Sequence, residues 1–268
     1  MWDKPRELNA MAMVLATVAV LMLGYAIATW TARRPTFEFR EVVVQTPLTR
    51  VNAAQLEAVI RDELKGTFFT MRLDRARAAI TKVPWVRNVT LRRQWPHRLE
   101  VSIEEQVPLA RWNDSALVNA QGEVFNATYK DALPKFAGPD GTASEVTRRY
   151  REWGNAVAPL NLIVNEVRLS PRGAWHLRLL HETVNATAAG ASAAPDIKAA
   201  NASDGSLDVE LGREDPANAM ARFVDIYQRT IGVLARSGTR VEQVDLRYRN
   251  GFSARVPGFR ERPQKKAA

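Results

Sequence analysis

The chain has 268 residues, a formal charge of +9 and a pI near 10.1, with 46% hydrophobic and 25% charged residues. This composition is typical of a folded protein and excludes a disordered tether. The absence of cysteine excludes a thiol nucleophile and disulfides, and it fits a compartment outside the cytoplasm without excluding others. The arginines alternate with apolar positions, and no zinc, RNP-type or helix-turn-helix pattern accompanies them, so we expect no nucleic-acid partner.

The first predicted element is an uncharged apolar segment at residues 10–32. As a helix it would be about 34 Å long, and the hydrocarbon core of a bilayer is about 30 Å thick. A cleaved signal peptide is the alternative, because Ala26, Ile27 and Ala28 have the small-x-small form of a cleavage site. The apolar run continues through Trp30 without a polar region, which favours a retained membrane anchor.

The flanking charges do not decide the orientation of this anchor, because Lys4 and Arg6 before it are matched by Arg33 and Arg34 after it. Large domains translocate with little regard to flanking charge, and most of the chain follows the anchor. We therefore expect residues 1–9 to be a cytoplasmic tail and the remainder to lie outside the cytoplasm. The protein would be a single-pass type II membrane protein.

Residues 36–106 are predicted to form one small domain. A strand comes first, then a helix that Asn52 caps and that ends near Gly66, then a short helix stopped by Pro84. Two strands with period-2 alternation follow at residues 86–93 and 99–105 and predict a hairpin. The predicted order is therefore β-α-α-β-β.

This order and four short motifs resemble a POTRA domain, a module of envelope proteins that dock other polypeptides. The motifs are Gly66-Thr67-Phe68-Phe69, Pro84-Trp85-Val86, Trp95-Pro96 and the stretch from Glu104 to Pro108. A generic small α+β domain is the alternative. We expect Trp85 to be a core residue whose truncation to alanine costs about 3–5 kcal/mol.

Residues 107–257 are predicted to form a second domain, an α+β fold with an extended, antiparallel-rich sheet. Ser144 is expected to cap one helix, and Asp215 with Pro216 to begin another. Between these helices, a hairpin turns at Pro171-Arg172-Gly173. Residues 183–206 are rich in Ala, Ser, Asn and Gly and are interpreted as an exposed insertion, and residues 258–268 as a disordered basic tail.

No catalytic constellation is found in the sequence. His97, His176 and His181 lack metal-ligand spacing, and nucleotide-binding loops and hydrolase signatures are absent. Glu104 and Glu105 are adjacent on a strand, so they are expected to point to opposite faces and cannot form an acid/base pair. We predict a protein without a cofactor or metal that is not an enzyme, with a membrane-anchored cell-wall hydrolase as the rival hypothesis.

Several further motifs follow the POTRA-like domain in a fixed order: LVNAQGEVF, LGRED followed by ARFVDIY, and VDLRYRNG. Together with the single anchor they resemble the FtsQ family of bacterial cell-division proteins, of Gram-negative type. This resemblance implies a divisome scaffold at the division septum that binds FtsB and FtsL in the periplasm and links early division proteins to septal peptidoglycan synthesis. A POTRA-bearing envelope assembly or secretion component is the alternative.

The resemblance also implies where the partner binds. In the family, FtsB adds a β-strand to the exposed edge of the final strand, around a motif that here reads Arg247, Tyr248, Arg249, Asn250, Gly251 and Phe252. Arg247 would pair with an acidic residue of FtsB, Tyr248 would be a rigid anchor and Gly251 would allow close backbone approach, while Arg172 matches a second basic contact. The alternative is that Arg247 and Arg249 are solvated charges and that Tyr248 is a core residue.

Overall fold

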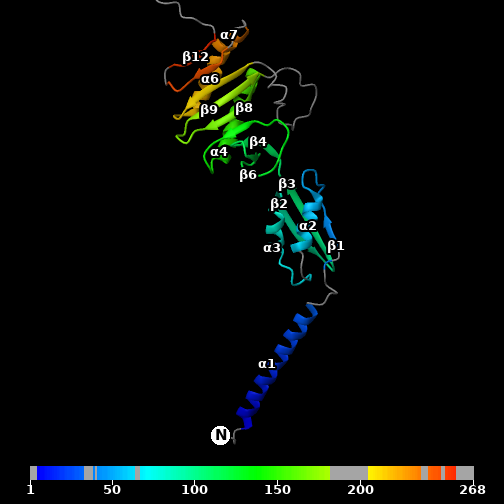
Figure 1. The fold of residues 1–268 in the computed structure, drawn as a ribbon. Coiled ribbons are helices and arrows are strands. Elements are labelled where there is room, and N and C mark those ends of the chain that lie inside the picture. Colours follow the sequence, from blue (N-terminus) through cyan, green and yellow to red (C-terminus); the bar gives the residue numbers. More distant parts are fainter. Residues whose placement is uncertain are drawn as a thin grey trace, which may run out of the picture. The chain divides into compact units, whose positions relative to one another are not determined.

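The computed structural model describes residues 5–32, 39, 41–63, 67–181, 205–236, 241–248 and 251–257. The chain divides into two compact units, Met1–Gln106 and Val107–Ala268 (Figure 1). The predicted N-terminal helix is present as α1 (Pro5–Ala32). Within it, Asn9–Ala32 is long and apolar enough to cross a membrane, and none of this stretch is buried against the rest of the protein.

The first unit has the predicted order β-α-α-β-β after α1. Its elements are β1 (Glu41–Val44), α2 (Ala53–Glu63), α3 (Leu73–Ile80), β2 (Val86–Gln94) and β3 (Arg98–Glu105). The three strands form one sheet in the order β1-β3-β2, in which β1 runs parallel and β2 antiparallel to β3. The POTRA-like fold predicted from the sequence is therefore confirmed.

Local sequence explains how this unit is assembled. The Asn52 side chain accepts hydrogen bonds from the backbone nitrogens of Ala54 and Gln55 at 3.0 and 3.3 Å, which satisfies two free donors at the start of α2. One face of the sheet and the apolar stripes of both helices form a buried core that includes Leu56, Ile60, Ile80, Leu99, Val101 and Ile103. The expected helix end at Gly66 lies outside the described residues.

The prediction that Trp85 is a core residue is wrong. Its side chain is only half-buried and packs against the rim of the core, whereas its neighbours Val83 and Val86 are buried. The backbone of Trp85 has a φ of 70°, in the left-handed region, and the residue lies in the turn just before β2. The Arg50 guanidinium carbon lies 5.9 Å from the centroid of its ring.

The second unit is built on a mixed sheet in the order β12-β11-β10-β9-β8-β7-β4-β5-β6. Five of its strand pairs are antiparallel and three are parallel, which confirms the antiparallel-rich α+β fold. The strands are β4 (Pro108–Trp112), β5 (Ala116–Asn119), β6 (Val124–Phe125), β7 (Lys135–Ala137), β8 (Leu162–Leu169), β9 (Trp175–His181), β10 (Ser206–Gly212), β11 (Gln243–Asp245) and β12 (Ser253–Arg255).

The main helices of this unit are α4 (Ala143–Val157) and α6 (Pro216–Ile226), which pack on β8 and β10 respectively. The core contains a T-shaped pair of Trp153 from α4 and Trp175 from β9, with ring centroids 5.1 Å apart. Phe223 of α6 is fully buried. The 3₁₀ turn η2 (Ala158–Leu160) follows α4, and the π-helical turn η3 (Tyr227–Ile231) connects α6 to α7 (Gly232–Arg236).

Two boundaries in this unit differ from the sequence-based expectations. Thr142, not Ser144, is the N-cap of α4, because the backbone nitrogen of Val146 already bonds to the Thr142 carbonyl oxygen at 3.0 Å. Ser206 belongs to β10, where it pairs with Leu180, so it is not part of an insertion. The predicted cap of α6 is confirmed, since the Asp215 carboxylate accepts from the Asn218 backbone nitrogen at 3.2 Å.

Candidate functional site

The turn between β8 and β9 and the ends of β10 and β11 meet at one end of the large sheet. Strand pairing places Gly212 opposite Trp175 and Asp245 opposite Glu210. A methyl group on Gly212 would lie 3.0 Å from Cγ of Arg247, and one on Gly173 would lie 3.7 Å from Cγ of Arg213. We call the surface that carries Arg172, Arg213, Arg247 and Tyr248 the arginine end. The sequence analysis predicted three of these residues and missed Arg213.

Arg247 is held at this end by acidic residues of its own chain. Its Nε lies 3.0 Å from both carboxylate oxygens of Asp245, its Nη2 lies 2.6 Å from Oδ2, and its Nε lies 3.3 Å from Glu210 Oε2. Hydrogen bonds to Asp245 raise the pKa of the guanidinium further above its usual value. Arg247 is therefore a positioned cation, and its Nη1 takes part in none of the bonds formed within the described part of the chain.

The same contact lowers the pKa of Asp245, whereas it raises that of Arg247. The hydrogen bond from Arg247 lowers the pKa of the Asp245 carboxyl below its usual value of 3.8, although partial burial opposes this shift. Glu210, the other carboxylate near Arg247, accepts a hydrogen bond from Gln243 Nε2 at 3.2 Å. This cluster of two carboxylates and one guanidinium fixes the conformation of the chain where β11 ends.

Tyr248 projects from this fixed backbone into solvent. Arg222 of α6 donates to the carbonyl oxygens of Tyr248 and Leu246 at 2.9 and 3.0 Å. The Tyr248 side chain is 62% exposed, so the alternative that it is a core residue is wrong. Arg222 lies in the ARFVDIY motif, but the motif does not predict this role, because Arg222 acts through the backbone carbonyls of a segment that is distant in sequence.

β12 is the outermost strand next to the arginine end. It pairs antiparallel with β11, and its residues Ser253, Ala254 and Arg255 are all exposed. No strand in the described part of the chain lies beyond it, so one side of its backbone is an open edge. The predicted motif precedes this strand: Phe252 is 39% exposed and a methyl group on Gly251 would meet open space, while Arg249 and Asn250 lie outside the described residues.

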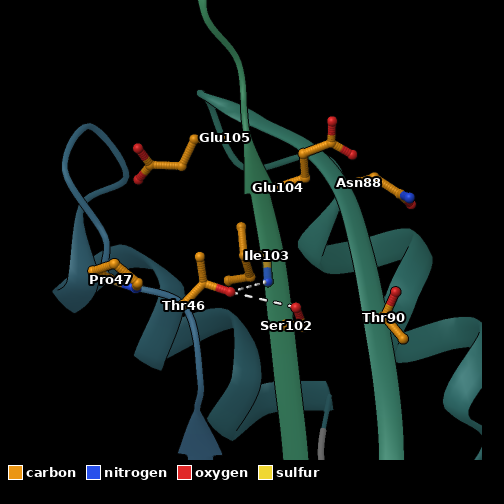
Figure 2. Close-up of a pocket in the computed structure, with 8 residues that line it drawn as sticks. All are labelled: Thr46, Pro47, Asn88, Thr90, Ser102, Ile103, Glu104 and Glu105. Atoms are coloured by element: carbon orange, nitrogen blue, oxygen red, sulfur yellow. Dashed lines mark hydrogen bonds between the residues drawn. The ribbon is translucent and has the colours of Figure 1, made fainter.

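The first unit has a shallow polar hollow of about 450 Å³ on the face of its sheet (Figure 2). Thr46 lies on one side of this hollow. Its hydroxyl oxygen lies 3.3 Å from the Ser102 hydroxyl and accepts a hydrogen bond from the Ile103 backbone nitrogen at 3.3 Å. Glu104 and Glu105 line the same hollow but point in different directions. Glu104 forms an ion pair with Arg87, and Glu105 binds the segment from Thr49 to Val51.

These contacts do not provide an acid/base pair. Burial raises the pKa of Glu105, but hydrogen bonds from the Thr49 hydroxyl and from the backbone nitrogens of Val51, Arg50 and Thr49 outweigh it and hold the pKa below the usual 4.5. Within the described ranges, no group of three His, Cys, Asp or Glu residues could hold a metal ion. His181, which sequence analysis found without ligand spacing, lies 3.0 Å from the Tyr227 hydroxyl.

Glu105 is expected to stabilise the first unit in a pH-dependent way. Because its pKa is lowered by folding, the stabilisation is present above pH 4.5 and is lost as the pH falls through the lower pKa of the folded state. Glu105→Gln should lower the free energy of unfolding by about 1.5–3 kcal/mol at neutral pH. Chemical denaturation at neutral and acidic pH would measure this difference, which should shrink in acid.

The neighbouring Glu104→Gln is the matched control for this substitution. Glu104 is 53% exposed in its ion pair with Arg87, so the change should cost at most about 1 kcal/mol. If Glu104→Gln and Glu105→Gln had equal effects at neutral pH, the special role of Glu105 in anchoring residues 49–51 would be refuted.

Comparison with known proteins bears on both units. Residues 110–247 match the profile of the C-terminal domain of cell division protein FtsQ/DivIB, and residues 37–106 match the FtsQ-type POTRA domain. The chain belongs to the FtsQ/DivIB family of cell-division proteins. It is 37% identical to cell division protein FtsQ of Burkholderia pseudomallei over 267 residues, which cover 97% of this chain and 96% of that protein.

Two other members of the FtsQ/DivIB family are also similar in sequence to this chain. Cell division protein FtsQ of Nitrosospira multiformis is 36% identical over 260 residues, with 95% of this chain and 99% of that protein covered. The Escherichia coli protein of the same name is 34% identical over 191 residues, with 69% of this chain and 60% of that protein covered. The match of the C-terminal unit adds a second FtsQ/DivIB domain to the POTRA match, and it extends to Arg247.

Proposed function

We propose that this protein is a non-catalytic scaffold of the divisome that binds FtsB and FtsL in the periplasm and links early division proteins to septal peptidoglycan synthesis. Membership of the FtsQ/DivIB family supports the cell-division role. The observation that carries the partner proposal is the open edge of β12 beside the exposed Tyr248. Copurification of FtsB and FtsL with the full-length chain from its native membrane tests it, and recovery of the chain without either partner would count against it.

The proposed binding mode is strand addition. An incoming FtsB segment would hydrogen-bond to the outer backbone groups of β12, and alternate side chains would provide specificity. Tyr248 would be the rigid aromatic contact beside this edge. Arg247 would offer its Nη1 to a carboxylate of FtsB while Asp245 keeps the guanidinium in place, and Arg172 with Arg213 would extend the basic surface along the arginine end.

The proposed layout places residues 1–9 in the cytoplasm and 10–32 in the inner membrane, with the POTRA domain at 36–106 and the C-terminal domain at 107–257 in the periplasm. The candidate span at Asn9–Ala32 supports the membrane segment. This layout would bring the open edge of β12 to the periplasmic segments of single-pass partners at the septum.

A reporter that is active only outside the cytoplasm should be active when fused after Val256. The large mass that follows α1 is expected to translocate, because long domains cross regardless of flanking charge. Mass spectrometry of the membrane-extracted protein should also find residues 1–28 still attached. A soluble product that begins at Thr29 would instead show that Ala28 precedes a cleavage site.

The absence of enzymatic activity is part of the same proposal. Glu104 and Glu105 are each engaged with separate partners, and the hollow that they line is shallow and open. Zymography on peptidoglycan with the purified full-length chain should give no cleared zone. A cleared zone would favour the rival hypothesis of a membrane-anchored cell-wall hydrolase.

A further inference from the structure

Two exposed aromatic side chains lie at one end of the first unit. Trp95, in the turn between β2 and β3, is 72% exposed, and Phe69, in the connection between α2 and α3, is 55% exposed. Arg93 joins the two segments, because its Nη2 donates to the carbonyl oxygen of Met71 at 2.6 Å. Exposed aromatic residues of this size, held by a folded scaffold, indicate a contact surface.

The strand pairing shows that this end is also where the chain arrives from α1. β1 runs parallel to β3, so the first residue of β1, Glu41, pairs with Arg98 immediately after the Trp95 turn. Phe39, just before β1, lies against Phe68 with ring centroids 6.0 Å apart. Only seven residue steps separate Phe39 from Ala32, the last residue of the candidate span. Even fully extended, this connection reaches at most about 25 Å.

The charged residues around Phe69 and Trp95 are predominantly basic. The exposed cations are Arg72, Arg92, Arg93 and Arg98. The nearby acids are Glu41, paired with Arg98, Glu100, opposite Arg92 in the strand register, and Asp74, which lies 3.7 Å from Arg77. The turn sequence from Arg92 to Arg98 contains three arginines and no acid. Tryptophan is enriched at membrane interfaces, and basic side chains are attracted to an anionic bilayer surface.

We propose that the end of the POTRA domain carrying Phe69 and Trp95 docks on the surface of the anionic bilayer in which α1 is anchored. The aromatic rings enter the headgroup region and the surrounding arginines contact lipid phosphates. The short connection keeps this end within reach of the bilayer surface, so docking needs no second tether. This inference rests on the membrane anchorage proposed above. Docking would give the POTRA domain a fixed orientation on the membrane, with the other end of the domain directed away from the bilayer.

The test uses the full-length chain in nanodiscs of phosphatidylethanolamine and phosphatidylglycerol that contain lipid-borne quenchers at headgroup depth. Because the chain has no cysteine, single cysteines can be introduced and labelled with a fluorophore. Gln94→Cys reports on the Trp95 turn, and Lys82→Cys, exposed at the other end of the domain, is the control. About 26 Å of strand separates Gln94 from the start of β2.

The label at Gln94 should be quenched at least about twofold more than the label at Lys82, because interfacial aromatic groups enter only about 5–10 Å of the boundary region. Adding Phe69→Ala and Trp95→Ala together should abolish this difference while circular dichroism stays unchanged. Equal quenching at both sites, or a difference that survives the double substitution, would overturn the docking. Extraction of the unmodified chain by alkaline carbonate would instead refute the anchorage itself, and the docking with it.

Discussion

Tyr248→Ala is expected to weaken binding of the FtsB periplasmic segment by at least about 30-fold, corresponding to about 2 kcal/mol for the truncation of a central aromatic contact. The expectation follows from the position of Tyr248, whose backbone is fixed by Arg222 and whose ring is 62% exposed beside the open edge of β12. Fluorescence anisotropy with a labelled FtsB segment and the detergent-solubilised full-length chain would measure the two affinities.

The substitution should leave the fold intact, because it removes a mostly exposed ring and keeps the backbone bond to Arg222. Val124→Ala is the matched control: Val124 is 46% exposed on β6, the strand at the opposite edge of the same sheet. It should bind FtsB as the unmodified chain does. Equal affinity for the Tyr248→Ala variant would remove Tyr248 from the proposed site.

Trp153→Ala should have the largest effect on stability among the substitutions considered. The side chain is only 2% exposed and forms a T-shaped pair with Trp175 in the main core. Truncation of a buried tryptophan costs about 3–5 kcal/mol, and the aromatic pair accounts for about 0.5–1.5 kcal/mol beyond area burial. For a unit of this size the melting temperature should fall by about 6–20 °C.

Thermal unfolding followed by circular dichroism would measure this change. Trp95→Ala is the control of the same residue type, because Trp95 is 72% exposed and its removal should change stability by no more than about 0.5 kcal/mol. If the Trp153→Ala variant had the same melting temperature as the unmodified chain, the packing of α4 against the sheet would not stabilise this unit as described.

Sequence periodicity predicted most of the fold because the strands and helices have one buried and one solvated face. The hairpins β2–β3 and β8–β9 and the helix capped by Asp215 follow directly from alternation and turn residues. Trp85 could not be placed in this way, because it lies in the turn before β2 with a left-handed backbone angle, outside the alternation of the strand. Ser144 is not the cap, because α4 begins two residues earlier, at the N-cap Thr142, without a hydrogen bond from a capping side chain.

The candidate site was predictable only through the family motif. The contacts of Arg247 with Asp245 and Glu210 could not be predicted, because they depend on the parallel pairing of β10 with β11, two strands that are far apart in the sequence. The roles of Gly212 and Arg222 likewise depend on tertiary contacts with the segment at Leu246–Tyr248. Burial of Tyr248 was an open alternative that only the tertiary structure could exclude.

Strand addition at β12 is tested most directly by cysteine crosslinking in the native membrane, since the chain has no cysteine of its own. Single cysteines would replace Ser253 or Arg255 and would be paired with cysteines placed along the periplasmic segment of FtsB. If a strand is added, moving the cysteine from Ser253 to Arg255 should shift the preferred crosslinking position on FtsB by two residues, because alternate side chains share a face. Crosslinks that show no such register, or that form only from Val124 on β6, would contradict strand addition at β12.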